Sequence, residues 1–318
     1  MSALIGTKIE ITEERGLIAA AQAGDERAFR ALVEPHRRVL EVHCYRMLGS
    51  LHDAEDVVQE TLMRAWRTLE RFERRASIDT WLYRIATNAC LDELERRPRR
   101  PEPVDPYPDE RLEQAAAPIV DPAARYAMRE GIELAFLTAI QKLPGRQRAI
   151  LILRDVLGWT APEVAELLDS TVAGANSALQ RARTTIDAEL PALSRTAASP
   201  SDRRLLADYV TAWEGSDIDG LVALLRDDAV LRMPPQPSVL GAAAIGEFFR
   251  GGPCSSGYGP VVCTPTRANG RPAVAMHRRE EGDVLEPHGV MVFEVEGGEI
   301  VGLDAFIDAG LVAHFPPG

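Results

Sequence analysis

The stretch DAEDVVQETLMRAW, residues 53–66, has the spacing of an amphipathic helix. Two stripes of apolar or small residues repeat every fourth position, one with Val57, Thr61 and Ala65 and the other with Val58, Leu62 and Trp66. The opposite face is polar and mostly acidic, with Asp53, Asp56, Gln59, Glu60 and Arg64. This pattern predicts a helix that packs on a core and exposes an acidic face, although the nearby segments RFERR and ERRPRR are basic.

The charge balance limits how this chain can bind nucleic acid. Its 318 residues, enough for two or three domains, carry a formal net charge of −12. Proteins that bind DNA without help are usually basic, so DNA contacts here must come from local patches or be supported by a partner. Residues 201–318 hold 17 acidic and 9 basic residues, which makes this part the poorest candidate for contact with a phosphate backbone.

The sequence shows no targeting segment and no metal motif. The N-terminus has no apolar run typical of a signal peptide, and no stretch is long enough for a membrane span, so we expect a cytoplasmic protein. The four cysteines form no CxxC pair, and none has a histidine at zinc-finger spacing. We therefore expect reduced thiols, no metal and no other cofactor.

The chain divides into three blocks joined by two linkers. Residues 15–97 and 126–193 are expected to be helical, because apolar residues recur at helical spacing in both. The first linker, residues 98–125, holds seven prolines and six acidic residues and is predicted to be an extended spacer without a helix. The second linker, SRTAASPSD, is small and polar and leads into residues 201–318.

A helix-turn-helix is predicted near the end of the second block. Thr160 and Glu163 have the spacing of a capping box, a turn is expected at residues 168–170, and a second helix follows from Thr171. The exposed candidates on that second helix are of types that read bases or bind phosphate: Asn176, Ser177, Gln180, Arg181 and Arg183. The alternative is a plain helical hairpin without DNA contact.

Basic and aromatic residues are interleaved near the end of the first block. Arginines at 71, 74 and 75 precede Trp81, and Tyr83, Arg84 and Asn88 follow it. Such a pattern suits melted, single-stranded DNA, because cations follow the backbone while aromatic or amide groups bind unstacked bases. The alternative for Trp81 is a place in the hydrophobic core.

The third block changes from helical to β-rich. Two helices and a strand are expected over residues 202–235, and another helix over 241–251. The segments MVFEVE and EIVGLDAF flank Gly297-Gly298, which is a hairpin signal. Helices followed by an antiparallel sheet indicate an α+β fold.

The order of these motifs resembles that of the extracytoplasmic-function sigma factors of bacterial RNA polymerase. The similarity covers residues 17–193 and includes DAEDVVQETLMRAW, TWLYRIATN and LPGRQRAILILRDVLGWTAPEVAELL. It implies two all-α sigma domains, the second with the helix-turn-helix, and promoter-specific transcription initiation as the function. It further implies that the helix at 53–66 docks on the clamp helices of the largest catalytic subunit of core RNA polymerase, through Asp53, Asp56, Gln59, Glu60 and Arg64.

The resemblance also implies DNA contacts. The minus-ten promoter element would be opened and read by Arg74, Arg75, Ser77, Trp81, Arg84 and Asn88. The minus-thirty-five element would be read by Thr171, Asn176, Ser177, Gln180, Arg181 and Arg183. Asn176 and Ala178 stand where many members carry arginines, so weaker phosphate anchoring is expected. The acidic first linker would thread toward the polymerase active centre, in a channel built for nucleic acid.

Residues 201–318 resemble the SnoaL-like cone fold, an α+β shell around a pocket. The candidate pocket residues are Trp213, His277, His288 and Asp304, and no acid–base pair at a defined spacing predicts catalysis. We therefore expect no catalytic residue, and a C-terminal domain that modulates the sigma factor through intramolecular contacts with the sigma domains.

Two alternatives remain open from the sequence. In one, the C-terminal domain is an enzyme or a ligand sensor with the sigma part as its output, which requires a pocket that is not plugged by Phe293, Phe306, Met276 and Trp213. In the other, the chain is a one-component DNA-binding repressor that needs no polymerase.

Overall fold

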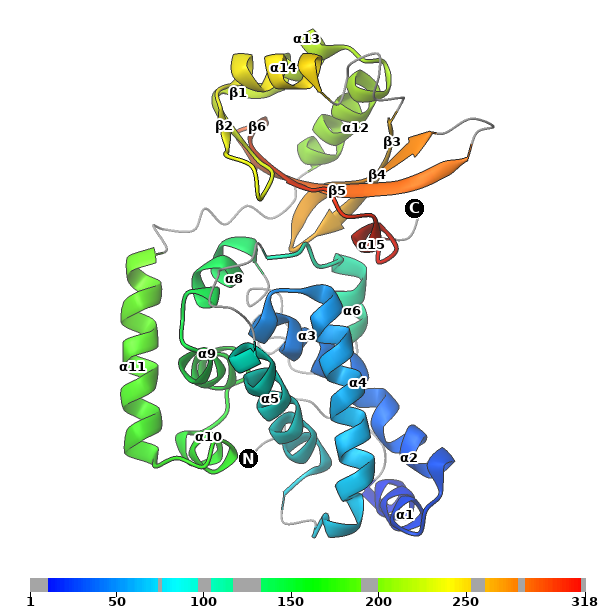
Figure 1. Cartoon of the computed structure of the whole chain (residues 1–318), viewed down its shortest axis with the longest axis vertical. Helices are drawn as coiled ribbons and strands as arrows, with labels where there is room; N and C mark the ends of the chain where they lie inside the picture. The colour runs from blue at the N-terminus through cyan, green and yellow to red at the C-terminus, as the bar shows by residue number, and fades with distance from the viewer. Residues whose placement is uncertain are drawn as a thin grey trace. The chain divides into compact units, whose positions relative to one another are not determined.

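The computed structural model describes residues 11–73, 76–96, 104–116, 133–189, 200–252, 261–279 and 284–315 (Figure 1). It divides into two compact units. The first contains Met1–Val104 and Arg111–Leu193, and the second contains Asp105–Glu110 and Ser194–Gly318. Within the described residues, no helix is long and apolar enough to cross a membrane.

The first half of the first unit is a set of amphipathic helices. Their bounds are α1 Ile11–Gln22, α2 Glu26–Val33, the 3₁₀ turn η1 Glu34–His36, α3 Arg37–Leu48, α4 Leu51–Thr68, the 3₁₀ turn η2 Leu69–Arg71, and α5 Ile78–Arg96. Gly49, at φ +76°, ends α3, and Ser50 caps α4 through the backbone N–H of Asp53. The prediction for residues 53–66 is confirmed, because α4 buries its Val57 and Thr61 stripe.

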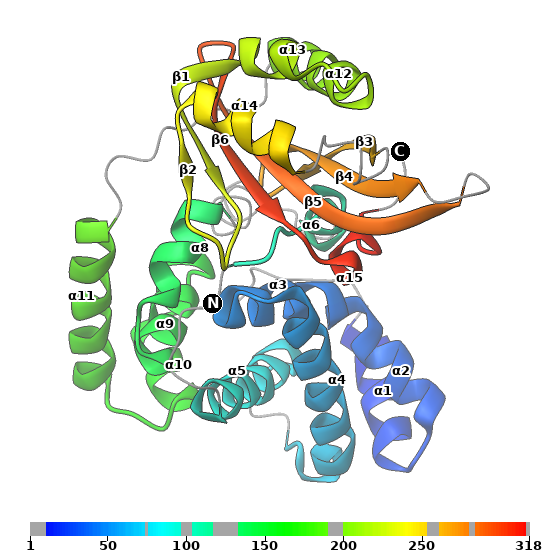
Figure 2. The same ribbon diagram turned by 45° about the horizontal axis from the view of Figure 1, so that its top comes forward.

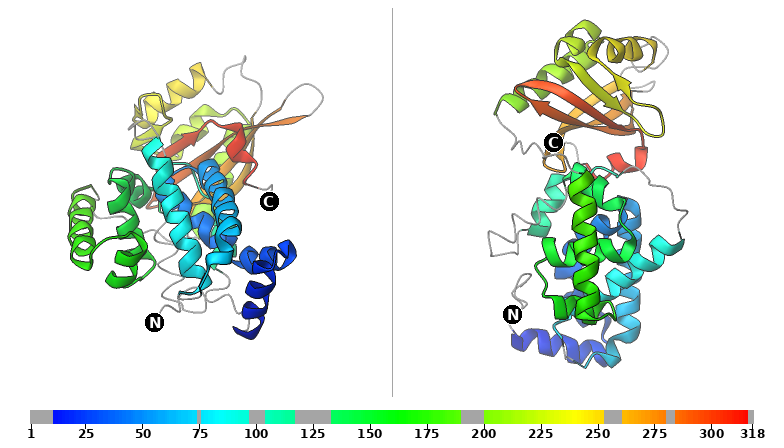
Figure 3. Two further views of the ribbon diagram at one scale, coloured as in Figure 1. Left: turned by 60° about the horizontal axis from the view of Figure 1, so that its bottom comes forward. Right: turned by 90° about the vertical axis from the view of Figure 1, so that its left-hand side faces the viewer.

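The second half of the first unit contains the predicted helix-turn-helix. Its elements are α8 Leu134–Gln141, α9 Gly145–Leu151, the π-helical turn η3 Ile152–Val156, α10 Ala161–Leu167 and α11 Val172–Glu189. They are preceded by α6 Asp109–Ala116, whose first two residues belong to the second unit. Thr160 and Glu163 form the expected capping box at the start of α10. The turn to α11 passes through Asp169 at φ +48° and is closed by the Ser170 N–H, which donates to the Ala165 carbonyl at 2.8 Å. Figure 3 shows α10 and α11 in green.

The expectation that the first linker has no helix is wrong. Residues 109–116 form α6, because Pro108 directly precedes the helix and the next proline is Pro118. Asp109 and Glu110 lie in the first turn, where negative charge stabilises the helix dipole. Residues 98–103 and 117–125 of this linker lie outside the described part of the chain.

The second unit is built on a six-stranded sheet with the order β2-β1-β6-β5-β4-β3 (Figure 2). Strands β1 and β6 are parallel, and every other neighbouring pair is antiparallel. The element bounds are α12 Pro200–Glu214, α13 Ile218–Ala223, β1 Leu225–Arg232, β2 Val239–Leu240, α14 Ala242–Gly251, β3 Val261–Ala268, β4 Arg271–Arg279, β5 Leu285–Glu296, β6 Glu299–Phe306 and α15 Ala309–Val312. This architecture confirms the predicted α+β class, but the sheet is mixed rather than antiparallel as expected, because β1 and β6 run parallel.

Helices α12, α13 and α14 cover one face of this sheet and bury a core against it. Trp213 of α12 and Phe249 of α14 meet edge to face, with ring centroids 5.1 Å apart, above Met276 and Met291 of the sheet. The predicted hairpin joins β5 to β6 through Gly297 at φ +61° and Gly298 at φ +89°. Two consecutive positive φ angles are what a tight hairpin turn requires, and glycine adopts them without strain.

Candidate functional site

The acidic face of α4 is exposed where the sequence pattern predicts it. Asp56 and Gln59 are exposed, whereas Asp53 and Glu60 are half-buried. Met63 follows Gln59 by four residues and Glu60 by three, so it lies on the same face, and it is 48% exposed. Met63 is not among the predicted contacts, although its spacing from Gln59 and Glu60 already places it on the same face of the helix.

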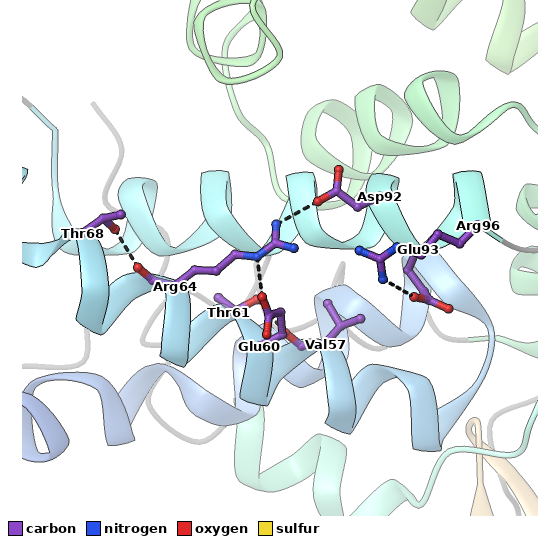
Figure 4. A network of polar contacts seen from close by, with 8 residues as sticks. All are labelled: Val57, Glu60, Thr61, Arg64, Thr68, Asp92, Glu93 and Arg96. Carbon is purple, nitrogen blue, oxygen red and sulfur yellow. Dashed lines mark hydrogen bonds and ion pairs between the residues drawn. The ribbon is translucent and has the colours of Figure 1, made fainter.

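Arg64, a predicted polymerase contact, is bound within the unit (Figure 4). Its Nε donates to Glu60 at 2.7 Å, and its Nη1 donates to Asp92 of α5 at 2.8 Å. The hydrogen bonds that Arg64 donates to Glu60 and then to Asp92 raise the pKa of its guanidinium above the ordinary value. Arg64 therefore ties α4 to α5 and holds Glu60 in place, which leaves Asp56, Gln59 and Met63 as the part of this face open to a partner.

The predicted minus-ten residues lie on α5 and at its entry. Ser77 is exposed and accepts a hydrogen bond from the Thr80 N–H at 3.2 Å, so it caps the helix. Trp81 is half-buried against Phe72, with ring centroids 4.9 Å apart. Asn88 is exposed. Arg74 and Arg75 lie outside the described residues.

Packing inside the first unit covers part of α5. Arg84 forms an ion pair of 3.1 Å with Asp169, which belongs to the turn of the helix-turn-helix. The rings of Tyr83 and Trp159 meet edge to face at 5.6 Å. We call this packing of α5 against the helix-turn-helix the closed arrangement. In it, the Arg84 guanidinium is paired with Asp169 rather than open to DNA.

The buried side chain of His43 contacts two residues of α5, Tyr83 and Thr87. His43 of α3 lies 2.9 Å from the Thr87 hydroxyl and meets the ring of Tyr83 edge to face. Burial, followed by the positive charge of Arg46, lowers the pKa of His43 to about 3. His43 is therefore neutral near pH 7 and positions α5 as a hydrogen-bonding core residue.

The second helix of the helix-turn-helix presents a polar face. All six predicted minus-thirty-five residues are exposed: Thr171, Asn176, Ser177, Gln180, Arg181 and Arg183. Two of them have structural partners, since Thr171 accepts from the Gly174 N–H at 3.0 Å and Arg183 donates to both carboxylate oxygens of Asp155 at 2.7 and 2.9 Å. The remaining four share one face of α11, at the spacing of adjacent helical turns.

We predict that Arg181→Ala weakens binding of minus-thirty-five duplex DNA by the reconstituted polymerase holoenzyme. Loss of one phosphate contact should lower the slope of log affinity against log salt by about one. Arg183→Ala is the matched control, because Asp155 already binds that guanidinium and the slope should change less. Equal effects of the two substitutions, measured by fluorescence anisotropy across a salt series, would contradict this assignment.

The second unit contains a cavity of about 370 Å³. It lies between the helices and the inner face of the sheet and is lined by Trp213, Leu231, Met233, Pro234, Pro235, Gln236, Phe248, Phe249, Gly252, Val261, Met276, His288, Met291, Ala305 and Ile307. Trp213 and Met276 form its wall rather than filling it, and Phe293 packs on Tyr209 with ring centroids 4.7 Å apart. The cavity therefore has room for a small ligand.

Two of the four residues predicted for the pocket do not line it. Trp213 and His288 do, whereas His277 and Asp304 lie next in sequence to the lining residues Met276 and Ala305. Successive strand residues point to opposite faces of a sheet, which places His277 and Asp304 on the other face. Asp304 instead accepts from Arg232 at 3.2 Å, and burial raises its pKa above the ordinary value.

The second unit also contains part of the first linker, held by contacts that no motif in the sequence predicts. The Tyr107 N–H donates to Asn269 Oδ1 at 2.7 Å, and the Asn269 N–H donates to the Tyr107 carbonyl at 2.9 Å. The Asp109 carboxylate accepts from Arg267 Nε at 3.0 Å and from the Gly270 N–H at 2.8 Å. Residues 105–110 thus form four hydrogen bonds, three with the turn between β3 and β4 and one with Arg267 at the end of β3.

Comparison with known proteins agrees with this architecture. Residues 32–100 match the model of Sigma-70 region 2, residues 133–186 that of Sigma-70 region 4, and residues 206–303 that of the SnoaL-like domain. The ECF RNA polymerase sigma factor SigG of Mycobacterium tuberculosis is 41% identical over 92% of this chain and 85% of its own length. The RNA polymerase sigma-H factor of Pseudomonas aeruginosa is 32% identical over 58% of this chain and 97% of its own.

A solved structure shares the fold of the chain. The crystal structure of the M. tuberculosis extracytoplasmic function sigma factor SigJ aligns with 89% of this chain and 97% of its own, with a TM-score of 0.58 and 22% identity. Together, the helical regions, the helix-turn-helix and the appended α+β unit define a promoter-specificity subunit of RNA polymerase. The chain belongs to the ECF RNA polymerase sigma factors and carries a C-terminal SnoaL-like domain.

Proposed function

We propose that this sigma factor binds core RNA polymerase through the exposed face of α4 and that its SnoaL-like domain regulates it by holding the first linker. The observation that carries the proposal is the set of hydrogen bonds that residues 105–110 form with the end of β3 and the β3–β4 turn. In this proposal, the exposed face of α4 forms the polymerase contact for promoter-specific transcription initiation, and the linker contacts restrain it.

The exposed part of α4 supports the polymerase contact. Asp56 and Gln59 offer a carboxylate and an amide. Met63, which follows them along the helix, offers an apolar side chain for the interface. An apolar side chain surrounded by polar groups is the composition typical of the energetic centre of a protein interface. The fixed positions of Glu60 and Arg64 reduce the entropy lost when a partner binds this face.

Contacts inside the second unit support control through the linker. Asn269 is 1% exposed and adopts φ +52°, and both its side chain and its backbone N–H form hydrogen bonds with the linker residue Tyr107. A linker that must enter the polymerase has to leave these contacts first. Binding of residues 105–110 to the SnoaL-like domain would therefore compete with formation of the active holoenzyme.

We predict that Asn269→Gly raises promoter-directed transcription by about three- to tenfold. Glycine keeps the positive φ but removes the acceptor for the Tyr107 N–H, and one hydrogen bond of about 1 kcal/mol corresponds to a several-fold shift in an equilibrium. Run-off transcription with purified core polymerase measures the effect. Ser216→Gly is the matched control, because Ser216 is exposed and also has positive φ, at +54°. Unchanged transcription by a folded Asn269→Gly protein would refute control through the linker.

A further inference from the structure

The cavity of the second unit has walls that carry almost no charge. Among the described residues that line it, none is Asp, Glu, Lys or Arg, and His288 and Gln236 are the polar side chains apart from the indole of Trp213. A charged ligand would lose its hydration there without gaining a countercharge, which is strongly unfavourable. The walls therefore suit a neutral and largely apolar molecule.

A β-bulge turns His288 toward the cavity. Met276 of β4 pairs with Gly289 of β5, but the next residue, His277, pairs with Pro287, so His288 is the extra residue between these two pairs. In an unbroken strand, His288 would lie on the face opposite Met291. Instead both residues line the cavity, because a bulge adds a residue and redirects the side chain.

The position after His288 must be glycine, because β5 passes very close to the backbone of Phe306 and Ile307 there. A Cβ atom at position 289 would lie 2.4 Å from the Phe306 carbonyl oxygen and 3.1 Å from the Cα of Ile307. Both neighbours are backbone atoms of the adjacent strand and its exit, so they cannot move aside like a flexible side chain. Glycine thus allows β5 to approach β6 closely, at the residue that follows His288.

The imidazole of His288 is suited to a neutral hydroxyl group. Burial, and then the positive charge of Arg278, lowers the pKa of His288 below its ordinary value. The neutral ring has one nitrogen that donates and one that accepts. A hydroxyl group also donates and accepts, so it can match either tautomer.

The volume of the cavity and the side chains that line it indicate the kind of molecule that would carry this hydroxyl group. An apolar cavity of about 150 Å³ holds one benzene molecule, so about 370 Å³ accommodates two to three rings. Met233, Met276 and Met291 adapt to ring edges, and Trp213 offers an aromatic surface. We propose that this cavity binds a neutral, mainly apolar compound of two to three rings with one hydroxyl group, and that His288 hydrogen-bonds that hydroxyl.

The test is calorimetric titration of the full chain with 2-naphthol and with naphthalene, which lacks the hydroxyl. We expect saturable one-to-one binding of both compounds. His288→Leu should weaken 2-naphthol binding by about five- to tenfold, the usual effect of one hydrogen bond, and leave naphthalene binding unchanged. Met233→Trp, at a half-buried lining residue, should abolish binding of both compounds, whereas Leu240→Trp, at a 69% exposed residue that does not line the cavity, should not.

Three results would overturn the proposal. The first is the absence of saturable binding of 2-naphthol up to its solubility limit. The second is full binding by a folded Met233→Trp protein. The third is a His288→Leu protein that binds both compounds as the unmodified chain does, or loses both to the same extent. Each result is independent of transcription and of control through the linker.

Discussion

Replacing Asp56 with lysine is expected to weaken binding of the sigma factor to core RNA polymerase by about 10- to 100-fold. Asp56 is exposed on the same face of α4 as Gln59 and Met63. Reversal of its charge removes an attraction and brings like charges together, and close charge pairs at interfaces couple by about 1.5 kcal/mol or more. Titration of core polymerase with a fluorescently labelled chain measures the change, which should shrink as salt screens the charges.

Two further variants separate a specific contact from a change in net charge. Glu70→Lys makes the same charge change at another exposed position, in η2, and should leave the affinity nearly unchanged. Met63→Ala should weaken binding by about tenfold without a strong salt dependence, because it removes apolar contact area. If Asp56→Lys and Met63→Ala both bind polymerase like the unmodified chain, the interface lies elsewhere.

Local signals in the sequence predicted most of the fold. The capping box at Thr160 and Glu163, the stripe along α4 and the Gly297-Gly298 turn each act over fewer than about ten residues. Periodicity, caps and turns are properties of neighbouring residues, so one sequence is enough to read them. For the same reason, helical spacing alone predicts the exposed face of α11 correctly.

Other features depend on pairs of residues that are distant in the chain. The contact of Tyr107 with Asn269 spans 162 residues, and no spacing rule connects them. A histidine is a plausible pocket residue on chemical grounds alone. In an unbroken strand, however, alternation would place His288 on the face opposite Met291, and no local signal in the sequence predicts the bulge that brings both into the cavity. His277 and Asp304 were wrong for the pocket because the sequence does not show which face of a strand is inside.

One buried arginine, Arg148, joins three helices of the first unit. Arg148 of α9 is 4% exposed, and its guanidinium donates to the backbone carbonyls of Met47, Ile140, Gln141 and Leu143. It thereby joins the end of α3 to α8 and α9. The ion pair of Arg84 with Asp169 is 43% and 80% exposed and contributes about 1 kcal/mol at most, because solvent screens it.

Arg148→Met is therefore expected to lower the free energy of unfolding by about 3 kcal/mol or more. The substitution preserves apolar volume but leaves several buried carbonyls without a donor, and each unsatisfied group costs about 1–3 kcal/mol. Hydrogen exchange should accelerate in α8, in α9 and at the end of α3, and urea denaturation gives the size of the loss. Arg148→Lys should recover only part of it, since an ammonium group lacks the planar fork that reaches carbonyls in several directions. Arg181→Met, on the exposed face of α11, controls for the loss of a positive charge. Equal urea midpoints for Arg148→Met and Arg181→Met would show that other donors satisfy these carbonyls.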